Sequence, residues 1–350
     1  MLRKALQPVP ATLYVVTPPH TPGPARISVV TPVYQGELTL PALAEEMAAL
    51  ATTQTSPEGH EWVVVEWLLV FDNGPDGSAD VMATLAETYP FVRPIWLSRN
   101  FGQHAATLAG MASSGGDWIV TLDEDGQHDP RDIGVFVDVA MREDAQLVYA
   151  EPTNPPPHAA LRNITSRGAK WFFSIFLAGG AVTTFQSYRL VLGELGRSVA
   201  AYAGAGVYLD VALGWVVGRL AHAPVALRSE GDERRSGYNP RRLLSHFWRL
   251  VLSSGTRALR LVSILGVLFA VAGVVFAIYV LIATALGAQT PVGWTSTMVV
   301  ALLGTGAILL SLGVIAEYLG VAVGMAMGRP PYLIISDPQD GPLARRPGRR

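Results

Sequence analysis

The chain has 350 residues, of which 50% are hydrophobic and 15% are charged, and its formal net charge is −2. A nucleic-acid-binding domain is normally basic, so this charge argues against nucleic acid as a partner. The absence of cysteine excludes disulfides, Cys-ligated zinc and a cysteine nucleophile. The apolar excess is local, because residues 261–316 contain no Asp, Glu, Lys, Arg or His.

From residue 26 onward, strand-like and helix-like segments alternate. Residues 1–25 before them are rich in proline, and we expect a flexible leader. The expected strands are 26–34, 62–71, 94–98, 118–122 and 147–150, and the expected helices are 40–50, 79–89, 105–113 and 132–140. This alternation predicts an α/β fold with a mostly parallel central sheet and helices on both faces. Ligands of such sheets bind at the carboxyl ends of the strands.

The rest of the sequence predicts membrane attachment. Residues 261–320 contain two apolar stretches of spanning length, separated by a turn near 287–293, and we expect two transmembrane helices. Segments 160–178 and 241–260 mix Arg or Lys with aromatic residues, which favours interfacial helices, although a core-packed amphipathic helix has the same pattern. Residues 26–240 form the expected catalytic domain and 321–350 a tail. Arginines flank the apolar region on both sides, which predicts a multi-pass cell-membrane protein with its catalytic domain and both termini in the cytoplasm.

Acidic residues follow two of the expected strands. Asp123 and Asp125 come directly after the strand 118–122, and Asp72 and Asp76 follow the strand 62–71. Two carboxylates at i and i+2 in a turn suit a hard cation such as Mg²⁺ or Mn²⁺ that also binds a substrate diphosphate. A solvated acidic loop is the alternative for such a triplet taken alone.

Five motifs give a more specific indication. They are Thr31–Tyr34 (TPVY), Asp72–Ser78 (DNGPDGS), Leu97–Ala106 (LSRNFGQHAA), Thr121–Pro130 (TLDEDGQHDP) and Arg235–Leu244 (RSGYNPRRLL). Together with the C-terminal apolar region they resemble family 2 glycosyltransferases of the dolichyl-phosphate mannose synthase and bacterial polyprenyl-phosphate sugar transferase group. The resemblance extends from about Arg26 to Arg329.

This resemblance implies a GT-A-type nucleotide-sugar-binding domain and an activity. A sugar would move from a UDP- or GDP-linked donor to a polyprenyl phosphate (undecaprenyl, dolichyl or decaprenyl) with inversion. The product would be a lipid-linked monosaccharide for cell-envelope glycans or glycosylation. Membrane lipids would be further partners, and the anchor helices leave lipid-facing surface for homo-oligomer formation.

The resemblance also assigns roles to individual residues. The implied nucleotide-sugar contacts are Pro32, Tyr34, Glu37, Asp72, Asn73, Asp76 and Asp123. Asp123, Asp125 and Gln127 would hold the metal, and Asp125 and Arg189 would be catalytic. For Tyr34, packing in the protein interior is an equal alternative to a contact with the nucleotide. For Glu37, the equal alternative is a negative charge that is favoured at the start of a helix.

Three departures from the family pattern matter. Asn73 stands where relatives commonly have a second Asp. Gln186 and Ser187 stand where many relatives have an acidic general base, and no base for a Ser187 nucleophile lies among residues 185–190. Glu151 or Pro152 stands where relatives often have an arginine. Other arginines are therefore the candidates for binding the lipid phosphate, and the alternative for each is a solvated surface charge. These candidates are Arg162, Arg167, Arg228, Arg234 and Arg235.

Two other functions remain open at this point. A processive polysaccharide synthase shares the expected catalytic fold, but such enzymes resemble one another in a Gln-x-x-Arg-Trp segment, and here Leu190 follows Arg189. An inactive membrane scaffold would fit Asn73 and the missing base. It would have no need for the charged cluster at the strand ends.

Overall fold

The structure is a computed structural model that describes residues 23–154, 186–204, 207–228, 293–328 and 330–337, with isolated positions between 266 and 286. Most of the expected leader, the segments 160–178 and 241–260, and most of the first expected transmembrane helix lie outside the described residues. So do four of the candidate phosphate-binding arginines, Arg162, Arg167, Arg234 and Arg235.

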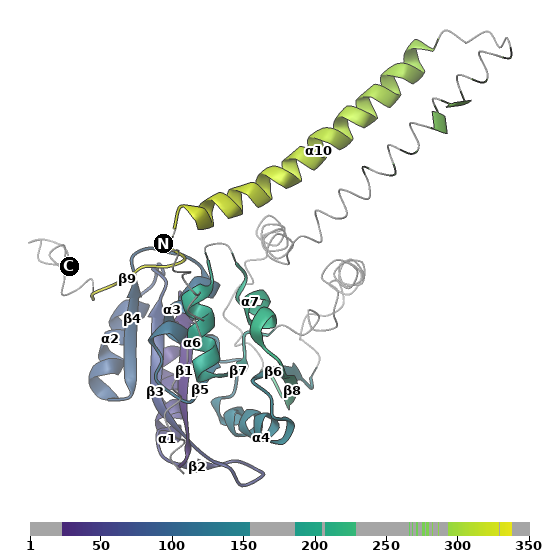
Figure 1. The fold of residues 1–350 in the computed structure, drawn as a ribbon. Helices are drawn as coiled ribbons and strands as arrows, with labels where there is room; N and C mark the ends of the chain where they lie inside the picture. The colour runs from purple at the N-terminus through teal and green to yellow at the C-terminus, as the bar shows by residue number, and fades with distance from the viewer. Residues whose placement is uncertain are drawn as a thin grey trace, which may run out of the picture.

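Strands and helices alternate in the α/β part as the sequence predicts (Figure 1). The strands are β1 (Ala25–Val33), β2 (Gln54–Thr55), β3 (Glu61–Phe71), β4 (Val92–Leu97), β5 (Trp118–Thr121), β6 (Leu147–Pro152), β7 (Arg189–Leu192), β8 (Leu220–Val225) and β9 (Ile334–Ile335). The helices are α1 (Leu40–Leu50), α2 (Ser78–Thr88), α3 (Gln103–Ser113), the 3₁₀ turn η1 (Pro130–Asp132), α4 (Ile133–Glu143), α6 (Gly193–Tyr202), α7 (Leu209–Val216) and α10 (Trp294–Ala326).

The strands form one mixed sheet with the order β8-β6-β7-β5-β1-β3-β4-β9, and β2 pairs with β3 outside this path. The pairs β1–β3, β1–β5, β3–β4 and β6–β8 are parallel, which confirms the predicted mostly parallel sheet. β7 is antiparallel to both β5 and β6, and the sequence analysis did not predict this strand. The carboxyl ends of β1, β3 and β5 meet at one edge, where both acidic loops therefore lie together.

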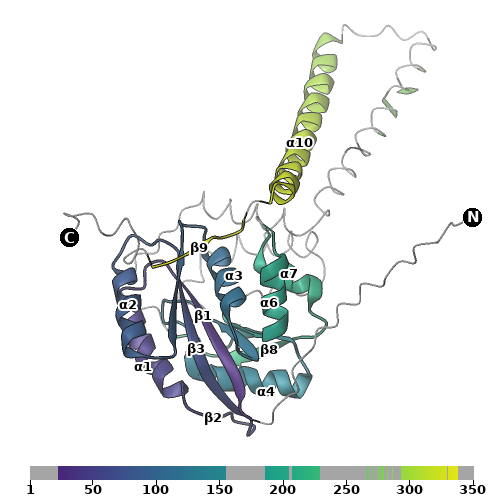
Figure 2. The same cartoon turned by 60° about the vertical axis from the view of Figure 1, so that its left-hand side comes forward.

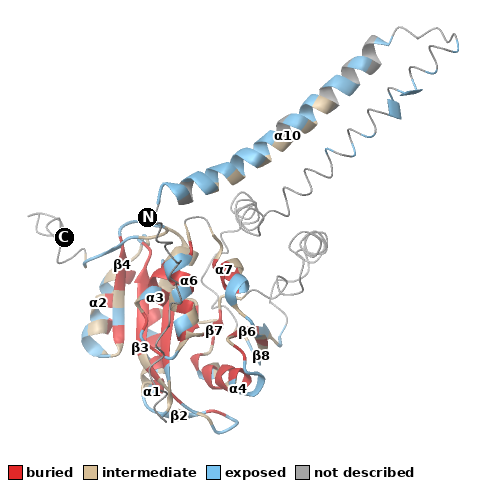
Figure 3. Ribbon diagram, in the orientation of Figure 1, coloured by how far each residue is buried: buried red, intermediate tan, exposed pale blue. Residues whose placement is uncertain are grey.

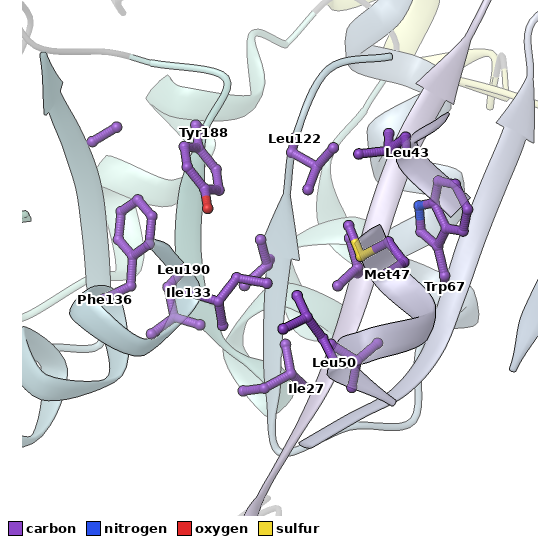
Figure 4. Packing of buried hydrophobic residues seen from close by; sticks show 14 of the residues in the cluster. Ile27, Leu43, Met47, Leu50, Trp67, Leu122, Ile133, Phe136, Tyr188 and Leu190 are labelled. Atoms are coloured by element: carbon purple, nitrogen blue, oxygen red, sulfur yellow. The ribbon is translucent and has the colours of Figure 1, made fainter. Parts of the chain in front are cut away.

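Two hydrophobic clusters cover the two faces of the sheet. One joins β1 and β3 to α1, α2 and α4, with Met47, Trp67 and Phe136 among its largest buried side chains (Figure 4). The other places α3, α6 and α7 against the opposite face. Because both faces are covered, nearly all residues of β1 from Ile27 onward are buried. The buried residues are concentrated in the sheet (Figure 3).

A single long helix, α10, projects from the α/β part (Figure 2). Within it Gly304–Val323 has a mean hydropathy of 2.0 and is 6% buried, so one helix of the described residues is long and apolar enough to cross a membrane. Only isolated positions of the first expected span are described, so the structure does not test the prediction of two spans.

The chain returns to the sheet after α10. The helix continues to Ala326, beyond the expected boundary at 320, and two of the described residues that follow it pair with the sheet. Ile334 and Ile335 form β9, which pairs antiparallel with Leu97 and Trp96 at the edge of the sheet. The amide N–H of Ser98 also donates to the carbonyl oxygen of Leu333 at 2.9 Å. The residues that follow α10 are therefore attached to the edge of the sheet in the α/β part.

Candidate active site

The loops after β1 and β3 are joined by reciprocal hydrogen bonds. The carboxylate of Glu37 accepts from the amide N–H of Gly77 at 2.9 Å, and Asp76 accepts from the amide N–H of Glu37 at 3.2 Å. The hydroxyl of Ser78 accepts from the amide of Gly36 at 2.8 Å. A Cβ atom at Gly74 would lie 1.5 Å from the carbonyl oxygen of Tyr34, so only glycine permits this approach. Glu37 and Asp76 thus shape the predicted nucleotide pocket by holding its two loops together.

Asp72 connects the end of β3 to the loop before α3. Its two carboxylate oxygens accept from the amide N–H groups of Phe101 at 2.7 Å and Gly102 at 2.8 Å. Burial raises the pKa of Asp72, although these two hydrogen bonds oppose the shift. Asn73, next to it, has a φ of 52° and donates from its side-chain amide to the carbonyl oxygen of Leu97 at 2.5 Å. Asparagine tolerates this left-handed conformation, and its amide can donate this hydrogen bond, whereas the carboxylate of an aspartate could not.

The other two predicted nucleotide contacts lie at the end of β1. Pro32 is half-buried in the strand, beside Val70 of β3. Tyr34 is 40% exposed, so its side chain is not part of the core. A ring exposed at the carboxyl edge of the sheet is available to a ligand, whereas the packing alternative required a buried one.

The three carboxylates of the acidic triplet Asp123–Asp125 have different surroundings. Glu124 accepts from the backbone amides of Tyr34 and Gln35, both at 2.9 Å, and so ties the turn to the end of β1. Asp125 accepts from the amide of Gln127 at 3.0 Å. Among the described residues neither Asp123 nor Asp125 takes part in an ion pair. Their role as metal ligands stays a prediction.

His128 closes the acidic turn on itself. Its Nδ1 accepts from the amide of Asp123 at 3.1 Å, and its ring stacks on Tyr188 with the centroids 4.7 Å apart. Tyr188 in turn donates its hydroxyl to the carbonyl oxygen of Asp129 at 2.7 Å. Burial lowers the pKa of His128, while the charges of Asp123 and Asp125 oppose this shift. The turn is therefore held rigidly, which is what a metal site requires of its carboxylates.

A polar cavity of about 210 Å³ lies beside Asp123. Side chains from α3, the segment before β7 and the start of α7 line it, and these are Gln103, His104, Thr107, Asp123, Gln186, Ser187, Arg189, Tyr208 and Asp210. Gln103 donates to one oxygen of Asp123 at 2.6 Å, and the hydroxyl of Ser187 donates to the other at 2.5 Å. No base lies among residues 185–190, as the sequence shows, but Asp123 is adjacent to Ser187 in space though 64 residues away in sequence.

Gln103, Tyr208 and Asp210 are site residues that sequence reasoning missed, and so is the contact of Ser187 with Asp123. Gln103 lies within a quoted motif, whereas the contact of Ser187 depends on the antiparallel insertion of β7 beside β5. Tyr208 carried no sequence signal, because the elements after β7 were not predicted. For Asp210 the only available indication was an acidic residue in an apolar segment, in what is the first turn of α7.

Two of the predicted arginines have partners within the protein. Arg189 is 3% exposed and forms a buried ion pair with Asp210. Arg228 pairs with Asp129 at 2.8 Å and with Glu46 at 2.9 Å. Arg228 therefore closes the end of the acidic turn onto α1, and a phosphate would have to compete with two carboxylates for it.

The contact of Arg228 with Asp129 predicts a pH-dependent contribution to stability. Burial raises the pKa of Asp129, but hydrogen bonds and charge from Arg131 and Arg228 lower it to about 2, from an ordinary 3.8. A lowered pKa means that the stabilisation is present above pH 3.8 and is lost as the pH falls towards 2. We expect Arg228→Met to lower the free energy of unfolding at pH 7 by about 1 kcal/mol, after allowance for solvent screening, and to flatten its decline between pH 4 and 2.

Denaturant unfolding of the full chain at pH 7 and at pH 3 measures this effect. Arg219→Met is the matched control, because Arg219 pairs with Asp144 and both side chains are more than 60% exposed. An equal loss in the two variants would contradict a specific role for Arg228.

The donor set of the turn fits a hard divalent cation. Asp123 and Asp125 offer carboxylate oxygens and Gln127 an amide oxygen, which are ligands that Mg²⁺ and Mn²⁺ prefer. No cluster of three or more His, Cys, Asp or Glu side chains gathers in the part of the chain that the structure describes. A metal held through one or two carboxylates therefore leaves coordination positions for a substrate diphosphate.

The acidic turn and the polar cavity lie at the carboxyl edge of a mostly parallel α/β sheet, which is where such sheets bind their ligands. A sequence model described as Glycosyl transferase family 2 matches residues 28–188. The chain belongs to this family and is a glycosyltransferase.

Individual relatives show how much of the chain the similarity covers. The undecaprenyl-phosphate 4-deoxy-4-formamido-L-arabinose transferase of Pseudomonas paraeruginosa is 30% identical over 314 residues, covering 88% of this chain and 89% of the relative. The enzyme of the same name from Pseudomonas fluorescens (strain Pf-5) is 29% identical and covers 92% of this chain and 93% of the relative. The crystal structure of mannosyl-3-phosphoglycerate synthase from Rubrobacter xylanophilus is 17% identical, covers 67% of this chain and 74% of that one, and has a TM-score of 0.48.

Proposed function

We propose that the protein transfers a sugar from a UDP- or GDP-linked donor to a polyprenyl phosphate, giving a lipid-linked monosaccharide. The observation that carries this proposal is the similarity to undecaprenyl-phosphate sugar transferases over 88% of the chain. Two features of the site support the proposal: the acidic turn, and the hydrogen bonds and ion pair that the carboxylates of the cavity make.

The acidic turn is suited to the donor. Asp125 and Asp123, with Gln127, would hold Mg²⁺ or Mn²⁺ against the donor diphosphate. When bound, such an ion neutralises the charge that develops on the departing nucleoside diphosphate. Asp72, Asn73, Asp76 and Glu37 keep the pocket for the nucleoside in shape through their backbone contacts.

The cavity is suited to an acceptor that needs no general base. Of its two described carboxylates, Asp210 is paired with Arg189, and Asp123 accepts from Gln103 and Ser187 and is the proposed metal ligand. A phosphate monoester has a second pKa near roughly 6, so it is already an anionic nucleophile at neutral pH. An attack by the lipid phosphate on the anomeric carbon therefore requires only positioning.

Direct attack predicts the stereochemical outcome. A single displacement inverts the anomeric centre, so an α-linked donor should give a β-linked lipid product, which NMR of the extracted product measures. Ser187 next to Asp123 is the group that a double displacement would use. Retention of configuration, or a glycosyl adduct on Ser187 found by mass spectrometry, would overturn this mechanism without overturning the transfer itself.

We further propose that the protein is a multi-pass membrane protein with the site in the cytoplasm. The support is the apolar helix α10, whose end pairs with the sheet through β9, together with the arginines that flank the apolar region. A reporter enzyme fused after Arg350 should be active only on the cytoplasmic side. Activity of that fusion only on the outer side would contradict this topology.

The acceptor phosphate needs cationic partners near the cavity. Arg162, Arg167, Arg234 and Arg235 remain predictions for this role, and Arg228 is a weaker candidate because Asp129 and Glu46 hold it. Guanidinium groups suit a phosphate because they donate two parallel hydrogen bonds. Alanine substitution at a residue with this role should raise the KM for the lipid more than the KM for the donor.

The experiment that tests the proposed function uses membranes that contain the protein and a panel of radiolabelled nucleotide-sugars. We expect one donor to give label that extracts into organic solvent and is released by mild acid as a monosaccharide. A long labelled polymer would indicate a processive synthase. No transfer and no metal-dependent hydrolysis from any donor would indicate an inactive scaffold.

A further inference from the structure

Arg189 is a buried cation at the centre of the α/β part. It lies on β7 with only 3% of its surface exposed, and burial lowers its pKa. An unpaired guanidinium at this depth would cost several kcal/mol, so the contacts that satisfy it are informative. Asp210, at 4% exposure, forms an ion pair with it, and Tyr149 donates its hydroxyl to the same carboxylate oxygen at 2.7 Å.

The second contact of Arg189 leads toward the acidic turn. Its Nε donates to the hydroxyl oxygen of Thr121 at 3.0 Å, at the end of β5. A guanidinium has no acceptor, so the single proton of Thr121 must point elsewhere. It points to the carbonyl oxygen of Ser187 at 2.5 Å. Arg189 therefore determines the direction in which the Thr121 hydroxyl donates.

The chain of hydrogen bonds ends on a predicted metal ligand. Because Thr121 holds the carbonyl group of Ser187, it also fixes where the hydroxyl of that serine lies. This hydroxyl donates to Asp123 at 2.5 Å, and Gln103 holds the other carboxylate oxygen at 2.6 Å. Each oxygen of a carboxylate has two acceptor positions, so Asp123 still has lone pairs for a cation.

We propose that Arg189, through Thr121 and Ser187, is a positioning residue that sets the orientation of the Asp123 carboxylate, and that Asp210 and Tyr149 hold Arg189 for this task. The inference rests on the proposed metal-dependent transfer and refines the role that the family resemblance gave to Arg189. With 3% of its surface exposed, Arg189 acts through its neighbours instead of on the substrate. Partners of metal ligands commonly change metal affinity or activity by roughly 10- to 100-fold when they are removed.

Thr121 offers the most selective test, because its substitution leaves the ion pair in place. Thr121→Val keeps the volume but loses the hydroxyl, whereas Thr121→Ser keeps the hydroxyl. Ser28→Ala is the matched control, because the Ser28 hydroxyl is also fully buried and bonded twice, to Glu66 and Gly116, toward the amino ends of the strands. The melting temperatures of the three variants show how much each loses in stability alone.

Two readouts follow, with all variants as full-length protein. Electron paramagnetic resonance measures the binding of Mn²⁺ alone, and transfer assays at saturating metal give kcat and the donor KM. For Thr121→Val we expect Mn²⁺ affinity and kcat each to fall by about tenfold, with the donor KM changed less than about threefold. Thr121→Ser should stay within about twofold of the wild type in both readouts, and so should Ser28→Ala despite its lower melting temperature.

The proposal is overturned if Thr121→Val matches Ser28→Ala in both readouts, or if Thr121→Ser is as impaired as Thr121→Val. The Mn²⁺ measurement needs neither donor nor acceptor. A wild type that binds Mn²⁺ but makes no lipid-linked sugar would therefore contradict the proposed function, while the comparison of Mn²⁺ affinities would still decide the role of Arg189 and Thr121.

Discussion

Asp125→Asn should lower sugar transfer by about 10³-fold while leaving the protein folded and inserted in the membrane. The substitution removes a charge that the cation needs, and stabilisation of a leaving diphosphate by a metal contributes several kcal/mol. The fold should survive because the asparagine side chain retains an oxygen for the amide of Gln127. Initial rates at saturating donor and acceptor, with and without added Mn²⁺, measure the effect.

Asp144→Asn is the control for this substitution. Asp144 is exposed, has a φ of 50° that asparagine tolerates, and lies at the end of α4, where its partner is the exposed Arg219. Its rate should stay within about twofold of the wild type. Full activity of the wild type in EDTA, or an Asp125→Asn enzyme that keeps more than a tenth of the rate, would contradict a metal centred on this turn.

Gly74→Ala should reduce kcat/KM for the donor by at least about 100-fold. The new Cβ would lie 1.5 Å from the carbonyl oxygen of Tyr34, so the loops after β1 and β3 must separate. That movement would break the contacts that join Glu37 to Gly77 and Asp76 to Glu37. A displacement of about 1 Å in a binding site costs roughly 100-fold in rate. Steady-state kinetics with the cognate donor give the result.

A glycine in open space provides the comparison for Gly74. A Cβ at Gly214 in α7 would meet nothing within 4 Å, and alanine favours a helix, so Gly214→Ala should be active and at least as stable as the wild type. If Gly74→Ala kept normal donor kinetics, the joined loops would not form the nucleotide pocket.

The sequence alone predicted the parallel half of the fold well. The β-branched runs of β1, β3 and β5 are buried on both faces, and each is followed by a helix whose apolar side covers the sheet. These signals are local, so periodicity and turn residues such as Gly74 and Pro75 were sufficient to place the acidic loops at one edge.

The contacts around those loops could not be predicted in the same way. β7 is only four residues long and antiparallel, and its position between β5 and β6 brings Ser187 to Asp123. β9 is two residues long and joins the sheet after a helix of 33 residues. Such short strands depend on pairing partners far away in the sequence, and they carry almost no pattern of their own. Glu124 likewise had no role predicted from the sequence, and its carboxylate accepts from the backbone amides of Tyr34 and Gln35.

The most direct measurement of the central claim compares two acceptors that differ only in the phosphate. Purified protein in detergent, with Mn²⁺ and the cognate labelled donor, is given either a polyprenyl phosphate or the polyprenol of the same length. We expect a lipid-linked monosaccharide from the phosphate, with a rate that falls as the pH drops through roughly 6, and less than about a hundredth of that rate from the alcohol. Equal transfer to the alcohol, or a polymer of the sugar from either acceptor, would contradict the account.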